Sequence, residues 1–556
     1  MKRAGSSLAA LTALVALATG CPQKQAVMTE GKPFPPVSVM FNTNESHKQI
    51  AEAIVQMWKE QLGINVALGN TEWKVYLAAQ TALDYDVCRA GWINDFNDPH
   101  NDIEMFLTGG GNNRTGWSSA EYDRLVAESM KETDQKKRWE TYRKAEAILI
   151  DEAPILPVYY YTNKNLVSKK IKGWHDTVLN LHPYDALWIA GKDGAPEPPE
   201  KQVVIFNNGV EPATLDPGMM SGVAEHHCAI VLYEGLCRSD PKTLEPLPGV
   251  AKSWDISPDG LKYTFHLRPE ARWQDSKGND KGPVTAQDFL YSWLRVVKTP
   301  EGEEPSEYQY VFDWIVAAKD IREGKEKDVS KFGVRVIDER TLEVTLATPC
   351  GFWLELCAYQ TLFPVHKETV EKHKMLWTKP ENIVANGPFL LDSWTPLKEI
   401  VFKKSKVYWR ATENRLETLK FLPIDDQNTA LNKFLNGEVD WGDDSSVPLA
   451  RADQVLKHPN FRCSPYLGIY FYRFNCTRPP FNDARVRRAF SMAVDKRTIC
   501  SNVQRFGEAP AGGLVPYGCG VPQYESPPGL SYDPEKARAL LREAGYSVKQ
   551  PKRQEY

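Results

Sequence analysis

A run of small and polar residues at positions 88–106, CRAGWINDFNDPHNDIEMF, combines groups that could hold a flexible, charged ligand. Arg89 offers a guanidinium fork that matches a carboxylate. Gly91 lets another backbone come close, so a ligand could add to a strand edge through main-chain hydrogen bonds that ignore its sequence. Trp92 supplies an aromatic wall, and the carboxylate of Asp95 follows. Such a set could recognise the constant parts of a peptide; the plainer interpretation is a strand bulge and a solvated acidic turn.

Other acidic and thiol groups suggest less chemistry. For Asp98, Asp102 and Glu104 we expect only a solvated loop. The chain has ten cysteines, so nine remain without Cys21, and at least one of them must be unpaired or intermolecular. Residues 350 and 357 are both cysteines and lie close enough in sequence to bridge locally.

Motifs for metal binding and catalysis are missing from the sequence. His226 and His227 precede Cys228, but no CxxC or His/Cys spacing typical of zinc ligands accompanies them. There is no GxSxG or HExxH, and GGGNN lacks the Lys-Ser/Thr of a phosphate-binding loop. We therefore predict a protein that is not an enzyme and that needs no cofactor or metal.

Length and charge narrow the class of protein. The 556 residues, 42% of them hydrophobic, are enough for two to four domains at roughly 100–200 residues each. The 68 basic and 72 acidic residues give a net charge of -4, and no basic run is interleaved with aromatic residues. A nucleic-acid partner is therefore not expected.

The N-terminus is typical of an export signal. MKRAGSSLAALTALVALATGC has a basic start, an apolar run and small residues before Cys21. Ending on a cysteine resembles a bacterial lipoprotein signal, which predicts a lipoprotein signal peptide over residues 1–21 and lipidation of Cys21. Ala18 stands where that motif prefers Leu, so a plain signal cut elsewhere is the alternative. No later run approaches the ~20 apolar residues of a membrane span, which favours an anchored chain.

The patterns that follow indicate an α/β fold. Strands are predicted at 37–41 (VSVMF) and 64–68 (INVAL), with a helix between them that is opened by Ser46 and closed by Gly63. Ser118-x-x-Glu121 predicts a second helix and about 134–150 a third. The Gly/Pro-rich stretch 190–202, AGKDGAPEPPEKQ, predicts a linker.

Several segments resemble one bacterial family. LYEGLCRSDPKTLEPLPGVAKSW, IVANGPFLLDSW, GEVDW, PPFNDARVRRAFSMAVDK and LLREAGY resemble the oligopeptide- and dipeptide-binding proteins of ABC importers. FNTNESHKQIAEAIVQMWKEQLGINV, CRAGWINDFNDP, GGGNN and PILPVYYY resemble the carboxy-terminal part of the same family, although they come first in this chain. The resemblance therefore implies a circular permutation in which residues 190–202 join the family's old termini; a rearranged or mis-assembled gene is the alternative.

The resemblance also implies the architecture. It predicts a periplasmic-binding-protein-like α/β fold of class II (cluster C) type, with two lobes, an inserted third domain and crossings near SPYLGIY and PVYYY. The implied parts are a ligand-binding lobe from 30–166 and 465–546, a first lobe from 167–189, 203–234 and 385–464, and an inserted domain at 235–384.

Site residues follow from the family motifs position by position. Asp95 matches the carboxylate that meets a peptide's amino terminus, and Arg89 and His47 match positions that reach its carboxylate. The remaining matches are Gly91 at the strand edge, Trp73 and Trp92 as walls of side-chain pockets, and Ser221, Gly222 and Val223 as a backbone-contacting loop of the opposite lobe. Ser221 and Gln80 stand where some relatives have Glu and Arg, which leaves peptide length and charge preference open.

The expected function is that of an extracytoplasmic solute-binding protein. It would capture short peptides between two lobes and deliver them to the membrane subunits of an ABC importer. We expect a monomer, lipid-anchored to a bacterial membrane in the periplasm or at the cell surface. The alternatives are another solute on the same fold, such as a dipeptide, a nickel chelate or an oligosaccharide, or a peptide-binding chaperone or receptor not coupled to transport.

Overall fold

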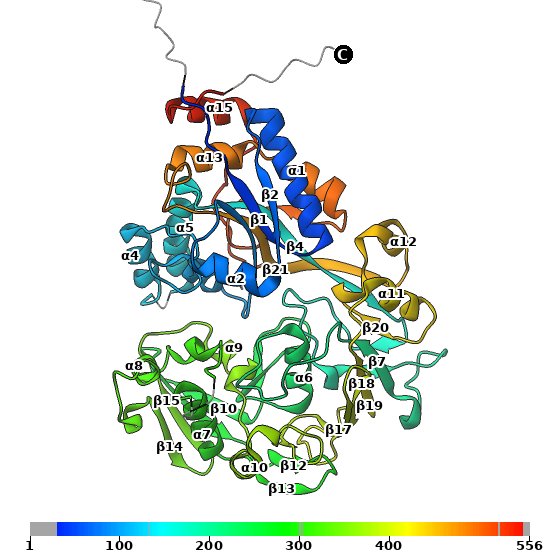
Figure 1. Cartoon of the computed structure of the whole chain (residues 1–556). Coiled ribbons are helices and arrows are strands. Elements are labelled where there is room, and N and C mark those ends of the chain that lie inside the picture. The colour runs from blue at the N-terminus through cyan, green and yellow to red at the C-terminus, as the bar shows by residue number, and fades with distance from the viewer. Residues whose placement is uncertain (1–30, 133, 300–301, 303, 521–522, 549–556) are drawn as a thin grey trace, which may run out of the picture.

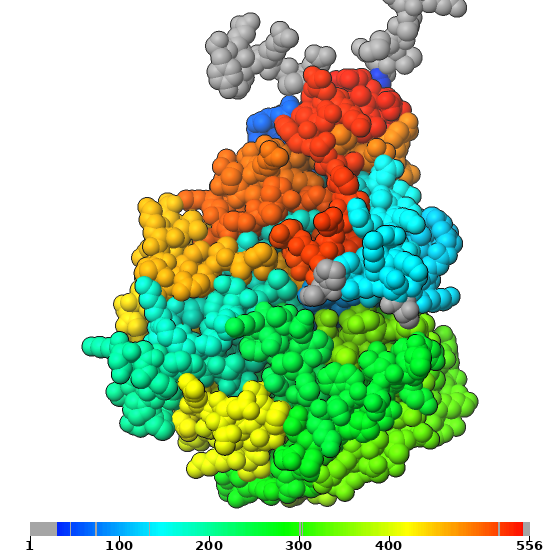
Figure 2. Space-filling model, turned by 180° about the vertical axis from the view of Figure 1, so that it is seen from behind, coloured from blue at the N-terminus to red at the C-terminus, as the bar shows by residue number. Residues whose placement is uncertain are grey.

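The computed structural model describes residues 31–548 except 133, 300–301, 303 and 521–522. It has two main parts (Figure 1). The upper part holds both ends of the described chain, in blue and red, and the lower part holds the green middle of the chain. Seen from behind, the cyan and red segments rest directly on the green segments (Figure 2). Among the described residues, no helix has the length and apolar character that a membrane span requires.

A large sheet runs through both parts. Its eleven strands follow the order β17-β18-β19-β7-β20-β4-β21-β3-β1-β2, with β22 paired to β4. The strands are β1 Ser38–Asn42, β2 Ala67–Thr71, β3 Val87–Ile93, β4 Ile155–Val167, β7 Val203–Asn207, β17 Phe389–Thr395, β18 Glu399–Lys404, β19 Thr418–Leu422, β20 Trp441–Gly442, β21 Phe461–Phe474 and β22 Ala509–Pro510.

The long strands β4 and β21 join the two parts. They pair antiparallel from Phe461↔Leu166 to Arg473↔Ile155, and the register shifts between Pro465 and Ile469. One end of β4 pairs with β20 in the lower part, while the other end and β21 pack in the core of the upper part. The connection between the parts is therefore a continuous β-ladder with a local irregularity.

The middle of the chain forms smaller sheets around its own core. The sheets have the orders β10-β11-β15-β14, β13-β12-β16 and β8-β9, and a further pair, β5-β6, lies in the lower part. Buried tryptophans at 273, 293 and 353 fill the core between these sheets and helix α7 (Ala286–Val297). The strands are β5 Ile171–Lys172, β6 Trp188–Ile189, β8 Cys237–Ser239, β9 Pro246–Pro248, β10 Ala251–Ile256, β11 Lys262–Leu267, β12 Arg272–Asp275, β13 Asp280–Pro283, β14 Val334–Asp338, β15 Thr341–Thr345 and β16 Val384–Ala385.

The predicted helices occur, but two begin at other caps. Helix α1 (Glu45–Leu62) is capped by Asn44, whose side chain accepts from the N–H groups of Ser46 and His47, so Ser46 is not the cap. The cap of α4 is Ser119 instead of Ser118. Gly63 ends α1 in a left-handed conformation, as predicted. The longer helices are α1, α2 Trp73–Thr81, α4 Ala120–Ser129, α5 Gln135–Glu152, α6 Val223–Leu232, α7 Ala286–Val297, α10 Lys367–His373, α11 Gln427–Leu435, α13 Ala484–Met492 and α15 Pro534–Glu543, and the shorter ones are α3 His100–Ile103, α8 Ala318–Arg322, α9 Trp353–Leu356, α12 Ala452–Leu456 and α14 Lys496–Thr498.

The two ends of the described chain lie side by side. The Lys32 N–H donates to the Gly545 carbonyl at 2.9 Å, and the Ser547 N–H donates back to the Lys32 carbonyl at 3.0 Å. The Lys32 ammonium also lies 4.5 Å from the centre of the Tyr546 ring. These ends are therefore held together by backbone pairing.

The predicted linker at 190–202 is a tight turn packed on the lower part. Ala190 pairs with Pro196, and Gly194 takes a φ of 82° at the tip, which favours glycine. Gln202 is 3% exposed. Its side-chain oxygen accepts from the Ile189 N–H at 2.8 Å, and its amide donates to the Ile189 and Glu197 carbonyls at 2.9 and 2.7 Å. One buried side chain thus fixes both ends of the turn.

We expect Gln202→Ala to lower the free energy of unfolding by about 1–3 kcal/mol, because it leaves the buried Ile189 N–H without its partner and removes one hydrogen bond each from the Ile189 and Glu197 carbonyls. Urea unfolding followed by circular dichroism measures the change. Glu200→Ala, in the exposed part of the same turn, should shift stability by no more than about 0.5 kcal/mol. Equal losses for the two variants would mean that Gln202 does not hold the turn.

Candidate functional site

A cavity of about 220 Å³ lies where three portions of the chain meet. The upper part contributes residues 93–96, which are the last residue of β3 and the three that follow it. The lower part contributes residues 179–181, the start of α6, and several side chains of the middle region. The lining residues include Asp95, Ser221, Gly222, Val223, His226, His227, Tyr308, Glu355, Tyr359 and Gln360.

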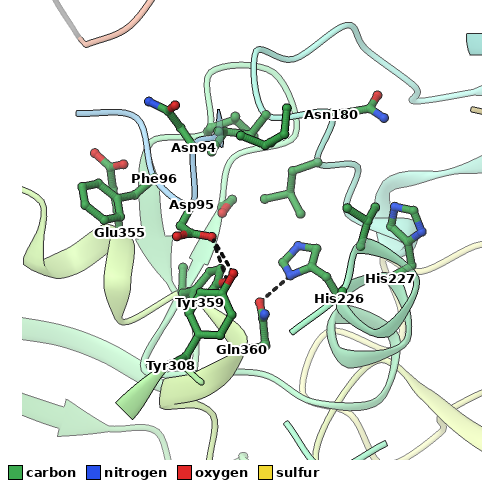
Figure 3. Close-up of a pocket in the computed structure, with 18 of the residues that line it drawn as sticks. Asn94, Asp95, Phe96, Asn180, His226, His227, Tyr308, Glu355, Tyr359 and Gln360 are labelled. Carbon is green, nitrogen blue, oxygen red and sulfur yellow. Dashed lines mark hydrogen bonds between the residues drawn. The ribbon is translucent and has the colours of Figure 1, made fainter. Parts of the chain in front are cut away.

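Asp95 is the charged centre of the cavity, and Tyr308 and Tyr359 lie against it (Figure 3). Its carboxylate accepts hydrogen bonds from the hydroxyls of Tyr308 at 3.2 Å, Tyr310 at 3.3 Å and Tyr359 at 3.1 Å. Burial raises the pKa of Asp95 to about 6, and the three tyrosine hydrogen bonds oppose that rise. The carboxylate is thus desolvated and surrounded by neutral donors, an environment in which a cation would be strongly held.

The loop after Asp95 is anchored in the core of the middle region. The ring of Phe96 stacks on Phe352 with 4.1 Å between ring centroids and belongs to that core. The Asn97 N–H donates to Glu355 at 2.9 Å, and burial raises the pKa of Glu355 to about 7. The stacking of Phe96 and the hydrogen bond from Asn97 therefore hold the loop that carries Asp95 against the middle region.

Gly91 lies on a strand edge that is open beside the cavity. β3 pairs with β21 on one side, with Gly91 opposite Tyr470, and with β1 on the other side only at Val87 and Cys88. The Asn94 N–H donates to Leu467 of β21. Since the backbone direction alternates along a strand, the N–H and C=O of Gly91 and Ile93 point to the other edge. A Cβ on Gly91 would lie 2.8 Å from the Tyr161 hydroxyl, so the position is also sterically tight.

Arg89 and His47 do not line the cavity but lie together around Tyr470. The guanidinium of Arg89 donates to the Tyr161 hydroxyl at 3.1 Å and lies 4.7 Å from the centre of the Tyr470 ring. His47 Nδ1 is 3.4 Å from the Tyr470 hydroxyl. Burial first, and then Arg89, lowers the pKa of His47 to about 3. Arg89 is therefore the positive charge of this pair at neutral pH.

The two predicted aromatic walls have different outcomes. The Trp92 indole donates to the side chain of Asn101 at 2.8 Å and packs against the core of the upper part, so it does not line the cavity. Trp73 begins α2, and its side chain lies outside the described residues. Cys21, the predicted lipidation site, also lies outside them.

The loop 221–223 faces Asp95 from the opposite wall. Gly222 is the N-cap of α6, and a Cβ there would lie 2.1 Å from the Glu225 carboxylate, so a side chain at this position would require the Glu225 side chain to move. Val223 is half exposed. The structure thus brings Asp95 and Ser221, Gly222 and Val223 together around one cavity.

His226 and His227 line the same cavity as neutral hydrogen-bonding groups. His226 Nδ1 contacts the side-chain oxygen of Gln360 (Figure 3), and His227 Nδ1 lies 2.9 Å from the side-chain oxygen of Asn208. Burial lowers the pKa of both rings. Within the part of the chain that the structure describes, no group of three or more His, Cys, Asp and Glu residues is arranged to hold a metal ion.

The prediction of a solvated acidic loop was wrong. Asp98 and Asp102 are buried. Asp98 forms an ion pair with the equally buried Arg138, and Asp102 accepts from the Asn94 amide at 2.7 Å. Glu104 lies 3.2 Å from the ring of His100. The partners of Asp102 and Glu104 lie within the same segment, whereas the partner of Asp98 lies 40 residues away.

Gln80, which stands where some relatives have an arginine, is part of the interior. Its side-chain oxygen accepts from the guanidinium of Arg473, and both residues are buried. An arginine therefore occurs near this position, but it comes from β21 instead of α2.

The model of the bacterial extracellular solute-binding proteins, family 5 middle, matches residues 19–114 and 245–554, which is most of the chain. The chain belongs to this family. Its two-lobed α/β fold is of the class II type that the sequence predicted.

Individual relatives of this family 5 chain include the periplasmic oligopeptide-binding protein OppA of Escherichia coli (strain K12), 37% identical over 358 residues. That alignment covers 63% of this chain and 64% of the relative, so the chain spans less than two thirds of its length. Among solved structures, the murein tripeptide-binding protein MppA of Escherichia coli has a TM-score of 0.54 at 32% identity, covering 63% of this chain and 67% of that one. A complex of Haemophilus influenzae OppA with RPPGFSPFR has a TM-score of 0.51 at 30% identity, covering the same shares.

The three tyrosines around Asp95 are the main site residues that the sequence analysis of this family 5 chain missed. They lie 213, 215 and 264 residues from Asp95 along the chain. The local signal is weak: Tyr308 and Tyr310 alternate in EYQY, which is an ordinary pattern in a chain with 23 tyrosines. Only the fold identifies them.

Proposed function

We propose that this chain is an extracytoplasmic solute-binding protein that captures short peptides between its two lobes and passes them to an ABC importer. The observation that carries the proposal is the half-buried, desolvated carboxylate of Asp95 in a cavity beside the open edge of β3. Relatives named as oligopeptide- and murein peptide-binding proteins support the choice of ligand. The chain would act by binding and not by catalysis.

In the proposed complex, the ligand's ammonium meets Asp95 and the tyrosine hydroxyls. The ligand backbone pairs with the free N–H and C=O groups of Gly91 and Ile93, as in strand addition. The loop 221–223 contacts it from the other lobe. Arg89 would receive the carboxylate of a ligand long enough to reach it, whereas His47 remains neutral. Because these groups meet only invariant parts of a peptide, the site would accept many sequences.

We also propose the domain division, the permuted order and the anchor given by the resemblance. The backbone pairing of Lys32 with residues 545–547 supports the permutation, since family members would have a continuous chain at that place. The turn at 190–202 would then join the family's old termini. A monomer anchored through Cys21 in the periplasm or at the cell surface completes the proposal.

A thermal shift of the purified protein against free-amine peptides of two to six residues tests the function. A peptide at about 100 times its dissociation constant should add roughly 2.7 kcal/mol of stability. Deoxycholate serves as a comparison because one relative is named as a probable deoxycholate-binding protein, and its anionic group would meet Asp95 unfavourably. Stabilisation by deoxycholate and by no peptide would contradict the proposal.

We expect peptide affinity to fall as the pH falls below 6. The pKa of Asp95 is raised to about 6, and only the ionised form pairs with an ammonium. Affinity is therefore full above this pKa and decreases by about tenfold at one pH unit below it. In the ligand-free protein, the raised pKa of Asp95 has the opposite effect on the free energy of unfolding. The stability that Asp95 contributes is present at low pH and is lost as the pH rises through 6.

Calorimetry between pH 5 and pH 8 measures this dependence. The groups facing Asp95 are three tyrosine hydroxyls and, at longer range, Glu104, and Glu355 lies in the same wall with a pKa of about 7. Asp95→Asn should abolish the slope around pH 6, and Glu355→Gln should keep it. The reverse outcome would assign the pH dependence to Glu355.

A further inference from the structure

Two buried cysteines, Cys237 and Cys357, lie next to each other in segments that lead to the cavity lining. Cys237 is the first residue of β8, and Cys357 follows the last residue of α9. Both are fully buried and both are free thiols in the structure. They are 120 positions apart in sequence, so the local spacing gives no sign that they meet.

The backbones of the two residues are in direct contact. The Cys237 N–H donates to the Cys357 carbonyl at 3.2 Å. After burial, the Cys237 thiol is the group that raises the pKa of the Cys357 thiol most. Gly235 approaches the same carbonyl so closely that a Cβ there would lie 2.3 Å from it. Because a direct backbone hydrogen bond joins the two residues, they are neighbours in space, as the two halves of a disulfide must be.

The other described cysteines have different surroundings. The thiols of Cys88, Cys463 and Cys476 donate to the carbonyls of Arg89, Phe506 and Phe474. Cys350, which the sequence suggested as a local partner of Cys357, is buried nearby, but the thiol that Cys357 contacts is that of Cys237. The geometry therefore selects a long-range pair over the local one.

This pair stands next to the residues that form the candidate site. Ser239, two positions after Cys237, lines the cavity, and so do residues 358–360, directly after Cys357. Tyr359 donates one of the hydrogen bonds to Asp95. A covalent link between the two cysteines would thus fix β8 to the segment that presents Tyr359.

We propose that Cys237 and Cys357 form a disulfide when the chain is exported, a proposal that rests on the extracytoplasmic location given above. The two S–H bonds break and one S–S bond forms. The S–S bond of a thiol–disulfide oxidoreductase breaks through a mixed disulfide and takes up the two electrons and two protons, which leaves the oxidoreductase with two thiols. Pairing occurs during folding, before the two thiols are buried.

Mass spectrometry of the exported protein tests the pairing. The full chain is produced in the bacterial periplasm, its thiols are blocked by alkylation under denaturing conditions without reduction, and the digest is searched for linked peptides. We expect a peptide pair joined through Cys237 and Cys357 that disappears after reduction. Full alkylation of both residues in exported, folded protein would overturn the proposal.

A second measurement tests whether the disulfide forms independently of the proposed extracytoplasmic location. The full chain made in the cytoplasm is unfolded in reductant and refolded with reduced and oxidised glutathione. Linked protein should melt roughly 5–10 °C higher than its reduced form. Cys237→Ser and Cys357→Ser should each abolish this sensitivity to reductant, and Cys463→Ser, at an exposed cysteine, should keep it.

The two proposals then fail in different ways. Peptide binding without any link in exported or refolded protein would reject the disulfide and leave the proposed function. A link in refolded protein that binds no peptide would reject the function and leave the pairing. A Cys350–Cys357 link would overturn the pairing proposed from the geometry.

Discussion

Asp95→Ala should weaken the binding of free-amine peptides by roughly thirtyfold to several thousandfold. A carboxylate enclosed with an ammonium is desolvated, and truncating it leaves the ligand's charge unpaired at a cost of about 2–5 kcal/mol. N-acetylated peptides, which lack this charge, should already bind the wild type poorly and lose little more. Titration calorimetry on the four combinations of protein and peptide gives the coupling between carboxylate and ammonium directly.

Two variants keep this test specific. Asp95→Asn preserves the size of the side chain and should lose nearly as much affinity for free-amine peptides, which separates charge from packing. Asp84→Asn changes an exposed acid of the same lobe and should leave affinity unchanged. If free and acetylated peptides lost the same affinity, Asp95 would not be the ammonium-binding group.

Asp98→Ala should lower the free energy of unfolding by about 3–5 kcal/mol, the second large effect, because it leaves the buried guanidinium of Arg138 without its charge partner. The variant also removes the acceptor of the His100 N–H. Adding Arg138→Met removes the stranded charge, so the double variant should be more stable than Asp98→Ala alone. Urea unfolding of the four proteins measures the cycle.

The matched control is an exposed ion pair on the same lobe. Glu121 and Arg124 of α4 are both about half exposed, so Glu121→Ala should change the stability far less than Asp98→Ala does. If Asp98→Ala were as mild as Glu121→Ala, or if the second substitution gave no recovery, the buried pair would not be what holds the loop 95–104.

Local sequence patterns predicted the elements of the fold better than their boundaries. The strand, helix, strand order at 37–68 is present, because its periodicity and the terminal Gly63 are local signals. The cap of α1 is Asn44 and not Ser46, since the cap is the residue whose side chain reaches the free N–H groups of the first turn. Local patterns did not predict the pairing of β4 with β21 or of β1 with β3, because these strands are far apart in sequence or separated by other elements. The family resemblance indicated only that the crossings lie near SPYLGIY and PVYYY, which are parts of β21 and β4.

The site was predictable where a motif carries it and unpredictable where partners are distant. The resemblance placed Asp95 and the loop 221–223, which the structure brings to one cavity. Asp98 appeared to be a solvated acid because its partner, Arg138, lies 40 residues away on α5. Sequence spacing contains no information on such contacts, and the same reason hid the tyrosines around Asp95.

A crystal structure with a bound free-amine tripeptide tests the central claim most directly. The account predicts the ligand's ammonium within about 3.2 Å of the Asp95 carboxylate, a hydrogen-bond distance. It also predicts ligand backbone groups paired with Gly91 and Ile93, and the loop 221–223 on the opposite side. A peptide bound with its carboxylate toward Asp95, or bound away from this cavity, would contradict it.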